Sequence, residues 1–307
     1  MKIFAVVALG LMFMGPGSDG TRQVRVDGTP FQSNSEPRYY VDYANFRNAD
    51  KQTYVEFYLH VAYEDLHFTK DGQGFQAGYN FSLEIWSEDE KLLQQHQTGD
   101  IIQVDSYDET IHSELARASL VAYTLPPGRY ILRTELRDME TKKSARIQEY
   151  VTVRDFKSAR LQISDIQFSQ QITPAPDGQP YVKNGRFVQP NAMKTFAYGI
   201  SEINLYFEVY NLRPTPGDEP GNYVTHFIFR NENGEQVAHI RRPHRKPGRM
   251  TAQSIKLPVE PFLSGRYSVT VKIEDSDNLE MSEVSGTFSV LDNAVSMTDA
   301  DTGELYK

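Results

Sequence analysis

The sequence predicts an all-β protein made of two tandem immunoglobulin-like β-sandwich domains, and three observations support this. Beyond Met14 no stretch keeps apolar residues at helical spacing for three turns, whereas apolar and polar residues alternate repeatedly from Tyr54 to Val290. Alternation with a period of two is typical of strands that have one buried face. The other two observations are a pair of matching segments and a pair of matching hairpins, one in each half of the chain.

The matching segments are residues 128–138 and 265–275, which align without gaps. Each begins with Gly-Arg-Tyr, continues with alternating apolar residues and ends in aspartate. The tyrosines, Tyr130 and Tyr267, each follow a proline-containing turn, as in the tyrosine corner of immunoglobulin-like sandwiches. We therefore expect each hydroxyl to donate a hydrogen bond back to the preceding turn. A buried aromatic residue without that hydrogen bond is the alternative.

The matching hairpins follow two similar strands, Tyr-Val-Glu-Phe-Tyr at 54–58 and Tyr-Phe-Glu-Val-Tyr at 206–210. Their alternation predicts two rows of core residues. The rows are Val55, Phe57, Leu59 and Val61 in the first strand, and Ile203, Leu205, Phe207 and Val209 in the second. The hairpin turns are expected at 87–90 and 231–234, where Asn233-Gly234 suits a tight turn because both residues tolerate positive φ.

These matches place the first sandwich at residues 38–155 and the second at 156–291. The joint over 154–158 is short, so we expect the domains to sit end to end with limited bending. Residues 18–37 are polar and aperiodic, which predicts a flexible leader, and residues 292–307 predict a disordered tail. Residues 172–197 are rich in proline and predict a long connection with a small hairpin centred on Asn184-Gly185.

The N-terminus has the pattern of a secretory signal peptide over residues 1–17. Lys2 precedes an apolar run over residues 3–14, which is followed by Gly-Pro-Gly-Ser. A helix of that length rises only about 18 Å, less than the roughly 30 Å bilayer core. The sequence thus predicts an exported protein of the periplasm, outer cell envelope or extracellular space, without a stable transmembrane anchor after signal removal. A buried N-terminal segment is the alternative.

Composition excludes several function classes. The formal net charge is −9, which argues against nucleic-acid binding because duplex affinity depends on lysines and arginines that neutralise phosphates. The chain has no cysteine, so disulfides, thiol nucleophiles and cysteine-ligated metals are excluded. It also lacks the common short catalytic and metal-binding motifs, and we expect no enzyme, no cofactor and no metal. Asp275 and Asp277 offer oxygen ligands for calcium, but short acidic turns are common.

One stretch of this acidic chain is strongly basic. Residues 241–249 hold five lysines or arginines and one histidine. Prolines and a glycine within it predict a loop. Arg241, Arg242, Arg245 and Lys246 are therefore candidates for binding anionic lipid, polysaccharide or an acidic protein partner. A solvated basic hairpin without a ligand is the alternative.

The polar faces of the two similar strands form a second candidate surface. They carry Tyr54, Glu56, Tyr58 and His60 in the first strand, and Tyr206, Glu208 and Tyr210 in the second. Aromatic rings beside carboxylates can bind sugars or a protein partner, because flat apolar area lies next to hydrogen-bond acceptors. Cross-strand aromatic packing inside the protein is the alternative.

Three motifs resemble one known family. They are Ser-Asp-Ile at 164–166, Asn-Gly at 184–185 followed by Gln-Pro-Asn at 189–191, and Leu-Tyr-Phe-Glu-Val-Tyr-Asn-Leu at 205–212. Over residues 38–290 the chain is similar to the N-terminal β-rich part of GWxTD domain-containing proteins, which are exported bacterial proteins without an established function. The family's Gly-Trp-x-Thr-Asp signature is missing, since the one tryptophan is Trp86. The resemblance implies fold and export but no catalytic residue.

Together these observations favour an exported, non-enzymatic binding or scaffolding protein of the cell envelope, with an unidentified protein or glycan partner. One alternative is a carbohydrate-binding module, which requires exposed aromatic residues in a row on one sheet face. Another is a hydrolase with a site at the domain junction. That activity requires a Ser-His-Asp set or paired carboxylates to converge there with shifted pKa values.

Overall fold

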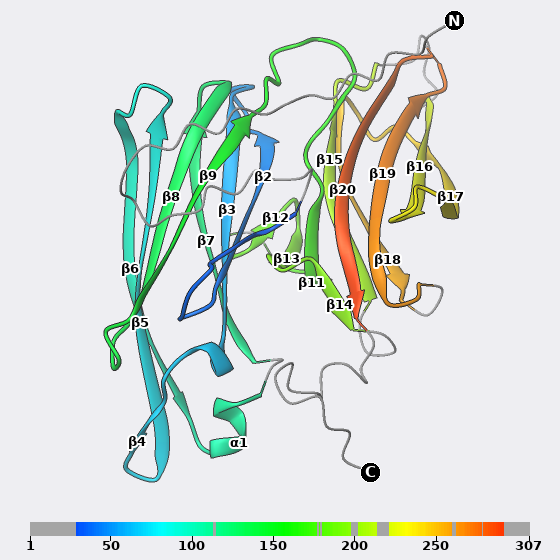
Figure 1. The fold of residues 1–307 in the computed structure, drawn as a ribbon. Helices are drawn as coiled ribbons and strands as arrows, with labels where there is room; N and C mark the ends of the chain where they lie inside the picture. The colour runs from blue at the N-terminus through cyan, green and yellow to red at the C-terminus, as the bar shows by residue number, and fades with distance from the viewer. Residues whose placement is uncertain are drawn as a thin grey trace, which may run out of the picture.

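The computed structural model describes residues 29–112, 115–176, 178, 180–197, 202–213, 221–259, 262–277 and 279–291. The expected signal peptide, the first part of the leader and the expected tail lie outside these residues. Within the described part, nearly every element is a strand, and the strands form four sheets (Figure 1). The predicted all-β fold is confirmed. The helices among the described residues are η1 (Tyr63–Asp65) and α1 (Tyr107–Thr110), and no described helix has the length and apolar character needed to cross a bilayer.

Domain one is a sandwich of two sheets. Its inner sheet, which faces domain two, contains β1 (Phe31–Gln32), β2 (Tyr40–Arg47), β3 (Thr53–Ala62) and β7 (Ala116–Leu125), in that order. Its outer sheet contains β4 (Thr69–Asp71), β5 (Gly74–Ser87), β6 (Leu92–Val104), β8 (Gly128–Asp138) and β9 (Ser144–Val153). In the outer sheet β5 lies between β6 and β8, and β9 follows β8.

Domain two is also a sandwich. Its inner sheet contains β10 (Gln162–Ile163), β11 (Gln167–Pro174), β12 (Val182–Lys183), β13 (Arg186–Pro190), β15 (Glu202–Tyr210) and β18 (Met250–Pro258). Its outer sheet contains β14 (Thr195–Ala197), β16 (Asn222–Asn231), β17 (Gln236–Arg245), β19 (Gly265–Asp275) and β20 (Met281–Leu291). The two domains share a strand order, because β2-β3-β7 corresponds to β11-β15-β18 and β6-β5-β8-β9 to β17-β16-β19-β20.

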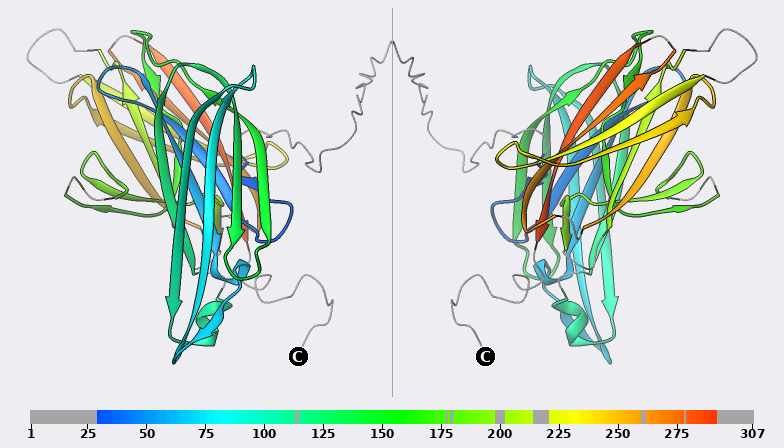
Figure 2. Two further views of the ribbon diagram at one scale, coloured as in Figure 1. Left: turned by 90° about the vertical axis from the view of Figure 1, so that its left-hand side faces the viewer. Right: turned by 90° about the vertical axis from the view of Figure 1, so that its right-hand side faces the viewer.

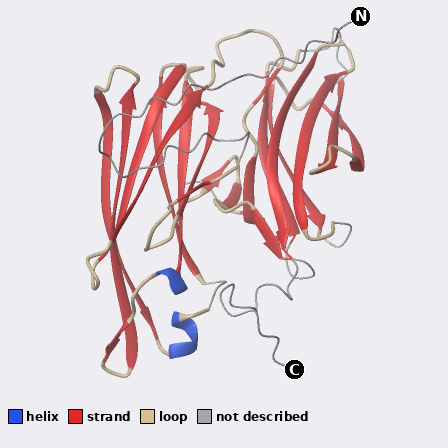
Figure 3. Cartoon of the chain, viewed as in Figure 1, coloured by secondary structure: helices blue, strands red, loops and turns tan. Residues whose placement is uncertain are grey.

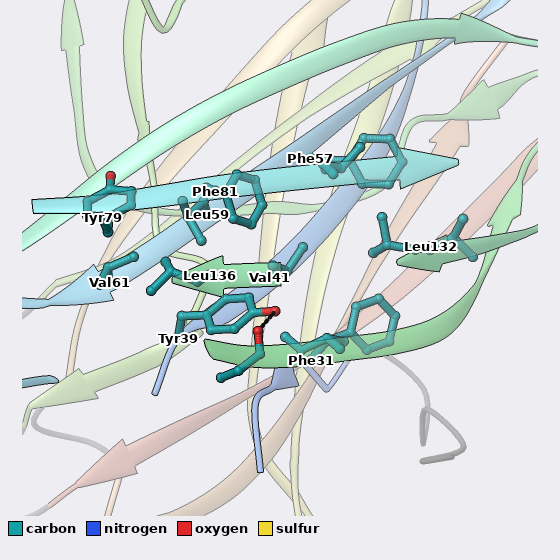
Figure 4. Packing of buried hydrophobic residues seen from close by; sticks show 14 of the residues in the cluster. Phe31, Tyr39, Val41, Phe57, Leu59, Val61, Tyr79, Phe81, Leu132 and Leu136 are labelled. Atoms are coloured by element: carbon teal, nitrogen blue, oxygen red, sulfur yellow. Dashed lines mark hydrogen bonds between the residues drawn. The ribbon is translucent and has the colours of Figure 1, made fainter. Parts of the chain in front are cut away.

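Both predicted rows of core residues are buried. The four residues of the β3 row lie in the core of domain one, and the four residues of the β15 row lie in the core of domain two. In domain one the ring of Tyr39 packs edge-on against Phe81, with ring centroids 6.2 Å apart (Figure 4). The Tyr39 hydroxyl is satisfied inside the core by Thr134, 2.8 Å away. Apolar burial of this kind supplies most of the driving force for folding.

Both predicted tyrosine corners are present. The Tyr130 hydroxyl donates to the carbonyl of Pro126, and the Tyr267 hydroxyl donates to the carbonyl of Leu263, each over 2.8 Å. The acceptor lies four residues before the tyrosine in both domains, so each hydroxyl ties the start of its strand to the preceding turn. The matched segments therefore hold the same local geometry in the two sandwiches.

Two expectations about connecting segments need correction. The flexible leader expected over 18–37 is wrong for residues 29–37, because β1 pairs with β2 and Phe31 is buried against Tyr43. The connection over 172–197 contains the predicted hairpin, since Asn184 and Gly185 have φ angles of 50° and 70° between β12 and β13. It is otherwise more regular than expected, because β13 pairs with β11 and extends the inner sheet of domain two.

The domains lie side by side, and not end to end as expected. Figure 1 shows the four sheets in sequence across the molecule, with the two inner sheets facing each other, and Figure 3 shows the same view; in Figure 2 the two outer sides face the viewer in turn. The contact contains Phe46 and Tyr58 from domain one and Val188 and Tyr206 from domain two. The physical reason lies in β3 and β15, because almost every residue of both strands is buried on either face. Such strands require a second layer of protein.

Candidate functional site

The two aromatic and carboxylate rows face each other across the contact between the inner sheets. Tyr58, Tyr206 and Tyr210 are fully buried, and Glu56 and Glu208 are buried as well, whereas Tyr54 is half-buried. The expectation that these six residues form a solvent-exposed binding surface is therefore wrong. Aromatic packing inside the protein is the correct interpretation, because each row is covered by the other domain.

Glu208 is the centre of the row in domain two. Its carboxylate accepts hydrogen bonds from the Tyr206 hydroxyl at 2.8 Å, the Tyr210 hydroxyl at 2.7 Å and the Asn184 side-chain amide at 2.9 Å. Burial and the nearby Glu208 charge raise the pKa of both tyrosines far above the usual range. Both hydroxyls therefore remain donors at any physiological pH, and the carboxylate is satisfied without solvent.

Glu56 is the corresponding carboxylate in domain one, and it accepts from both domains. One of its oxygens lies 2.6 Å from the Tyr58 hydroxyl and 2.6 Å from the Lys183 ammonium of β12. The ammonium also lies 3.9 Å from the centroid of the Phe46 ring. Burial lowers the pKa of Lys183, and the Glu56 charge opposes that shift. The hairpin of β12 and β13 thus inserts a cation between the two sandwiches.

Other buried and half-buried polar contacts fix the same arrangement. Lys194 of domain two pairs with Asp42 of domain one over 2.8 Å, and both side chains are at most 5% exposed. The Asn45 side chain of domain one donates to Asp165 of domain two over 2.6 Å, and Arg154 in the joint pairs with the same carboxylate. Buried ion pairs tolerate few alternative geometries, because any displacement leaves an uncompensated charge. The contact therefore specifies one relative position of the domains.

The junction does bring two carboxylates together, as the hydrolase alternative requires. Glu56 and Glu208 both lie near Lys183, and both charges oppose the lowering of its pKa by burial. Each carboxylate is buried, however, and each accepts two or three hydrogen bonds from protein donors. Both oxygens of Glu208 and one oxygen of Glu56 are thus engaged by protein donors, as in a structural contact.

His60 on β3 provides a pH-dependent measure of burial. It is 5% exposed, and burial lowers its pKa to about 4, whereas an unfolded histidine titrates near 6.5. As the pH falls from about 6.5 to about 4, His60 therefore becomes protonated in the unfolded chain but stays neutral in the folded chain. The stability contributed by neutral His60 is complete above about pH 6.5, and we expect it to fall by about 2 kcal/mol between about pH 7 and pH 5.

Urea unfolding of the wild type and of His60→Gln at both pH values measures this contribution. Carboxylates titrate in both proteins, so the difference between the two pH-dependent losses isolates the histidine. Equal losses in the two proteins would contradict the assignment.

The basic stretch is a strand through Arg245, which corrects the predicted loop. β17 is an edge strand that pairs with β16, and Pro243 lies within it. Alternation places Arg241 and Arg245 on the outer face of the sheet, whereas Arg242, opposite the buried Thr225, points the other way. All three arginines are exposed. Charged residues and proline on an edge strand also hinder its pairing with other sheets.

Lys246 is not a surface residue, contrary to the prediction. Its side chain is 4% exposed, and its ammonium lies 2.6 Å from Asp275 and 2.6 Å from Asp277. It also donates to the carbonyl of Arg213 over 3.0 Å. Because the ammonium occupies the space between the two aspartates, these residues form an internal ion cluster and not the calcium site that their spacing allowed.

In the fold, further positively charged residues lie beside β17 on the outer face of the sheet, and their spacing in the sequence did not predict this. His226 on β16 lies opposite Arg241 on one side and Lys272 of β19 on the other. Arg230 shares this face by alternation along β16. Glu274 and Glu283 also lie on this face, but in the described part of the chain no carboxylate comes within ion-pair distance of Arg241, Arg245, Arg230 or Lys272. We call Arg230, Arg241, Arg245 and Lys272 the basic face.

No protein-family model and no curated protein matches the chain. Among solved structures, a Bacteroides uniformis β-glucuronidase is similar with 8% identity over 78% of this chain and 26% of its own, at a TM-score of 0.27. A glycosyl hydrolase family 2 member from Bacteroides cellulosilyticus has 10% identity over 77% and 28%, also at 0.27. The fibronectin(III)-like modules of Clostridium thermocellum CbhA have 11% identity over 81% and 91%, at 0.21. The chain spans about a quarter of the length of the first two.

Proposed function

We propose that this protein is an exported, non-enzymatic binding unit of the cell envelope, and that its basic face binds an acidic polysaccharide. The observation that carries the proposal is the set of arginine and lysine side chains on the outer face of domain two, without carboxylate partners among the described residues, in a chain of net charge −9. Unpaired cations gathered on one face of an acidic protein create a local field that attracts anions.

The shape of the basic face favours an extended polymer over a small anion. Arg241 and Arg245 are four residues apart on one strand, which separates them by about 13 Å. Lys272 lies two strands away from β17, so the cations are spread over a flat sheet and do not converge on a single point. A chain of repeating carboxylates can meet several of them at once, whereas one phosphate or carboxylate can meet one or two.

The locked domain contact supports a binding role over a catalytic one. Both carboxylates at the junction are buried and hydrogen-bonded, and the ion pairs of Lys183 and Lys194 cross between the domains. A rigid pair of sandwiches holds its outer faces in a constant position, so a polymer that binds there pays little to order the protein.

Binding of polygalacturonate by surface-immobilised protein tests the proposal. We expect the double variant Arg241→Glu and Arg245→Glu to bind about tenfold or more weakly, and wild-type binding to weaken as salt increases, because exposed charges are screened. The matched control is Arg129→Glu with Arg137→Glu on the outer sheet of domain one.

Absence of wild-type binding at low salt would overturn the proposal, as would equal losses in the two double variants. Anionic phospholipid vesicles and poly-glutamate serve as further arms. Stronger binding to either of them than to polygalacturonate would identify a membrane or an acidic protein as the partner instead.

A second candidate function is the binding of a neutral glycan by the outer sheet of domain one. Trp86, half-exposed on β5, donates to Glu84 over 2.8 Å and lies under the guanidinium of Arg133 at 4.6 Å. Tyr150 on β9 shares this face. An aromatic ring among planar polar groups is suited to sugar rings. Because Trp86 is the one tryptophan, a change in its fluorescence on addition of neutral oligosaccharides would favour this face.

A further inference from the structure

Two histidines on the outer sheet of domain two lie close enough to share a ligand. Nδ1 of His226 on β16 lies 3.1 Å from Nε2 of His239 on β17, and the two rings are stacked with centroids 5.3 Å apart. His226 pairs with Arg241 and His239 pairs with Ile228, so the histidines are diagonal neighbours on adjacent strands. We propose that these two nitrogens form a chelating site for a divalent transition metal ion such as Cu²⁺, Ni²⁺ or Zn²⁺.

The separation of the two nitrogens fits a chelate. Imidazole nitrogens bind these metals at about 2.0–2.1 Å. Two nitrogens 3.1 Å apart can therefore both reach one ion, with an angle at the metal close to a right angle. The backbone ladder fixes the two Cβ positions and the rings are already stacked, so the side chains lose little freedom when the ion binds. His239 is exposed, which leaves the ion a path from solvent.

The remaining nitrogen of His226 is placed as in many metal sites. Nε2 lies 3.5 Å from a carboxylate oxygen of Glu274 on β19. Histidines that bind metals usually donate their other N–H to a carboxylate, which selects the tautomer and raises the basicity of the ligating nitrogen. At this distance the two groups form no hydrogen bond, but the Glu274 charge favours a proton on Nε2, which leaves the Nδ1 lone pair to face Nε2 of His239 or to bind an ion.

The histidine pair lies beside two positively charged side chains. Lys272 and Arg241 are the cations nearest in the sheet register, and their repulsion limits affinity for a positive ion.

The protein supplies two direct ligands, and water completes the coordination. Among the residues that the structure describes, no group of three or more histidine, aspartate or glutamate side chains converges in a way that holds a metal. Two imidazoles with open positions favour the order Cu²⁺ over Ni²⁺ and Zn²⁺, because affinity for nitrogen ligands follows that series. Nothing in this geometry rests on polysaccharide binding, although Arg241 and Lys272 of the basic face are neighbours of the site.

Isothermal titration of the untagged chain with CuCl₂, NiCl₂ and ZnCl₂ at neutral pH tests the site. We expect one ion per chain, with His226→Ala or His239→Ala weakening the binding by about tenfold or more, and Glu274→Gln weakening it severalfold. His96→Ala is the matched control, because His96 lies on β6 in domain one. Circular dichroism of each variant checks that it is folded.

The electron paramagnetic resonance spectrum of the Cu²⁺ complex provides a second readout, and two coupled nitrogens are expected. Absence of wild-type binding at millimolar metal would overturn the proposal. The same conclusion would follow if His239→Ala and His96→Ala bound the metals equally well, because the ions would then be held elsewhere on the chain.

Discussion

Lys194→Met is expected to lower the free energy of unfolding by about 3–5 kcal/mol. The Lys194 ammonium pairs with Asp42 over 2.8 Å, and the two side chains are 5% and 4% exposed. Removal of the cation leaves a carboxylate buried between the domains, and breaking one half of a buried pair carries a penalty of this size. The Asp42 carboxylate cannot recover its hydration unless the inner sheets separate.

Urea unfolding followed by circular dichroism measures the loss, and two further variants control for it. Lys143→Met breaks a pair of similar length, 2.7 Å to Glu36, but both side chains are mostly exposed, so little change in stability is expected. The double variant Lys194→Met with Asp42→Leu should recover much of the loss, because no charge remains buried. A loss for Lys194→Met as small as that for Lys143→Met would show that the domain contact is hydrated.

Tyr267→Ala is expected to cost about 3–5 kcal/mol, because it removes a buried ring and leaves a cavity. The ring is 8% exposed and packs against Phe262 and Phe288, with centroids 5.1 Å and 5.6 Å away. Its hydroxyl donates to the carbonyl of Leu263. Tyr267→Phe keeps the ring and removes that donor, so a loss of about 1 kcal/mol is expected.

The comparison of the two substitutions separates packing from the corner hydrogen bond. Thermal and urea unfolding of both variants are measured together with Tyr107→Ala, because Tyr107 is 60% exposed and its removal should change stability little. A loss below about 1 kcal/mol for Tyr267→Ala would show that the ring contributes little to the core. Equal losses for the alanine and phenylalanine variants would assign the whole effect to the hydroxyl.

Features that depend on neighbouring residues could be predicted from the sequence. The core rows on β3 and β15 follow from alternation, because successive side chains of a strand point to opposite faces. The tyrosine corners follow from a turn and a tyrosine four residues later, and the hairpin at Asn184 follows from the tolerance of asparagine and glycine for positive φ. The structure contains all of these features.

The candidate sites were predicted less well, because each depends on what lies opposite a strand. Alternation places Glu56 beside Tyr58 but does not reveal that domain two covers them. Arg241 and Arg242 belong to one basic stretch of the sequence, but in the strand their side chains point to opposite faces of the sheet. Lys246 joins Asp275 only because the end of β19 comes beside it in the fold. Prolines suggested a loop, although an edge strand accommodates proline where no partner strand needs its N–H.

The sequence alone determined the fold class, the core-facing residues and the corner hydrogen bonds, because these depend on backbone sterics and on contacts a few residues apart. Tertiary structure decided which polar face is buried and which is open. It paired Lys183 with Glu56 across the domains, and it brought His226 and His239 together on one sheet. The physical reason is that alternation with a period of two shows which face of a strand is apolar and has to be buried. It does not show which other strand buries that face, because this depends on the shape and charge of residues far away in the sequence.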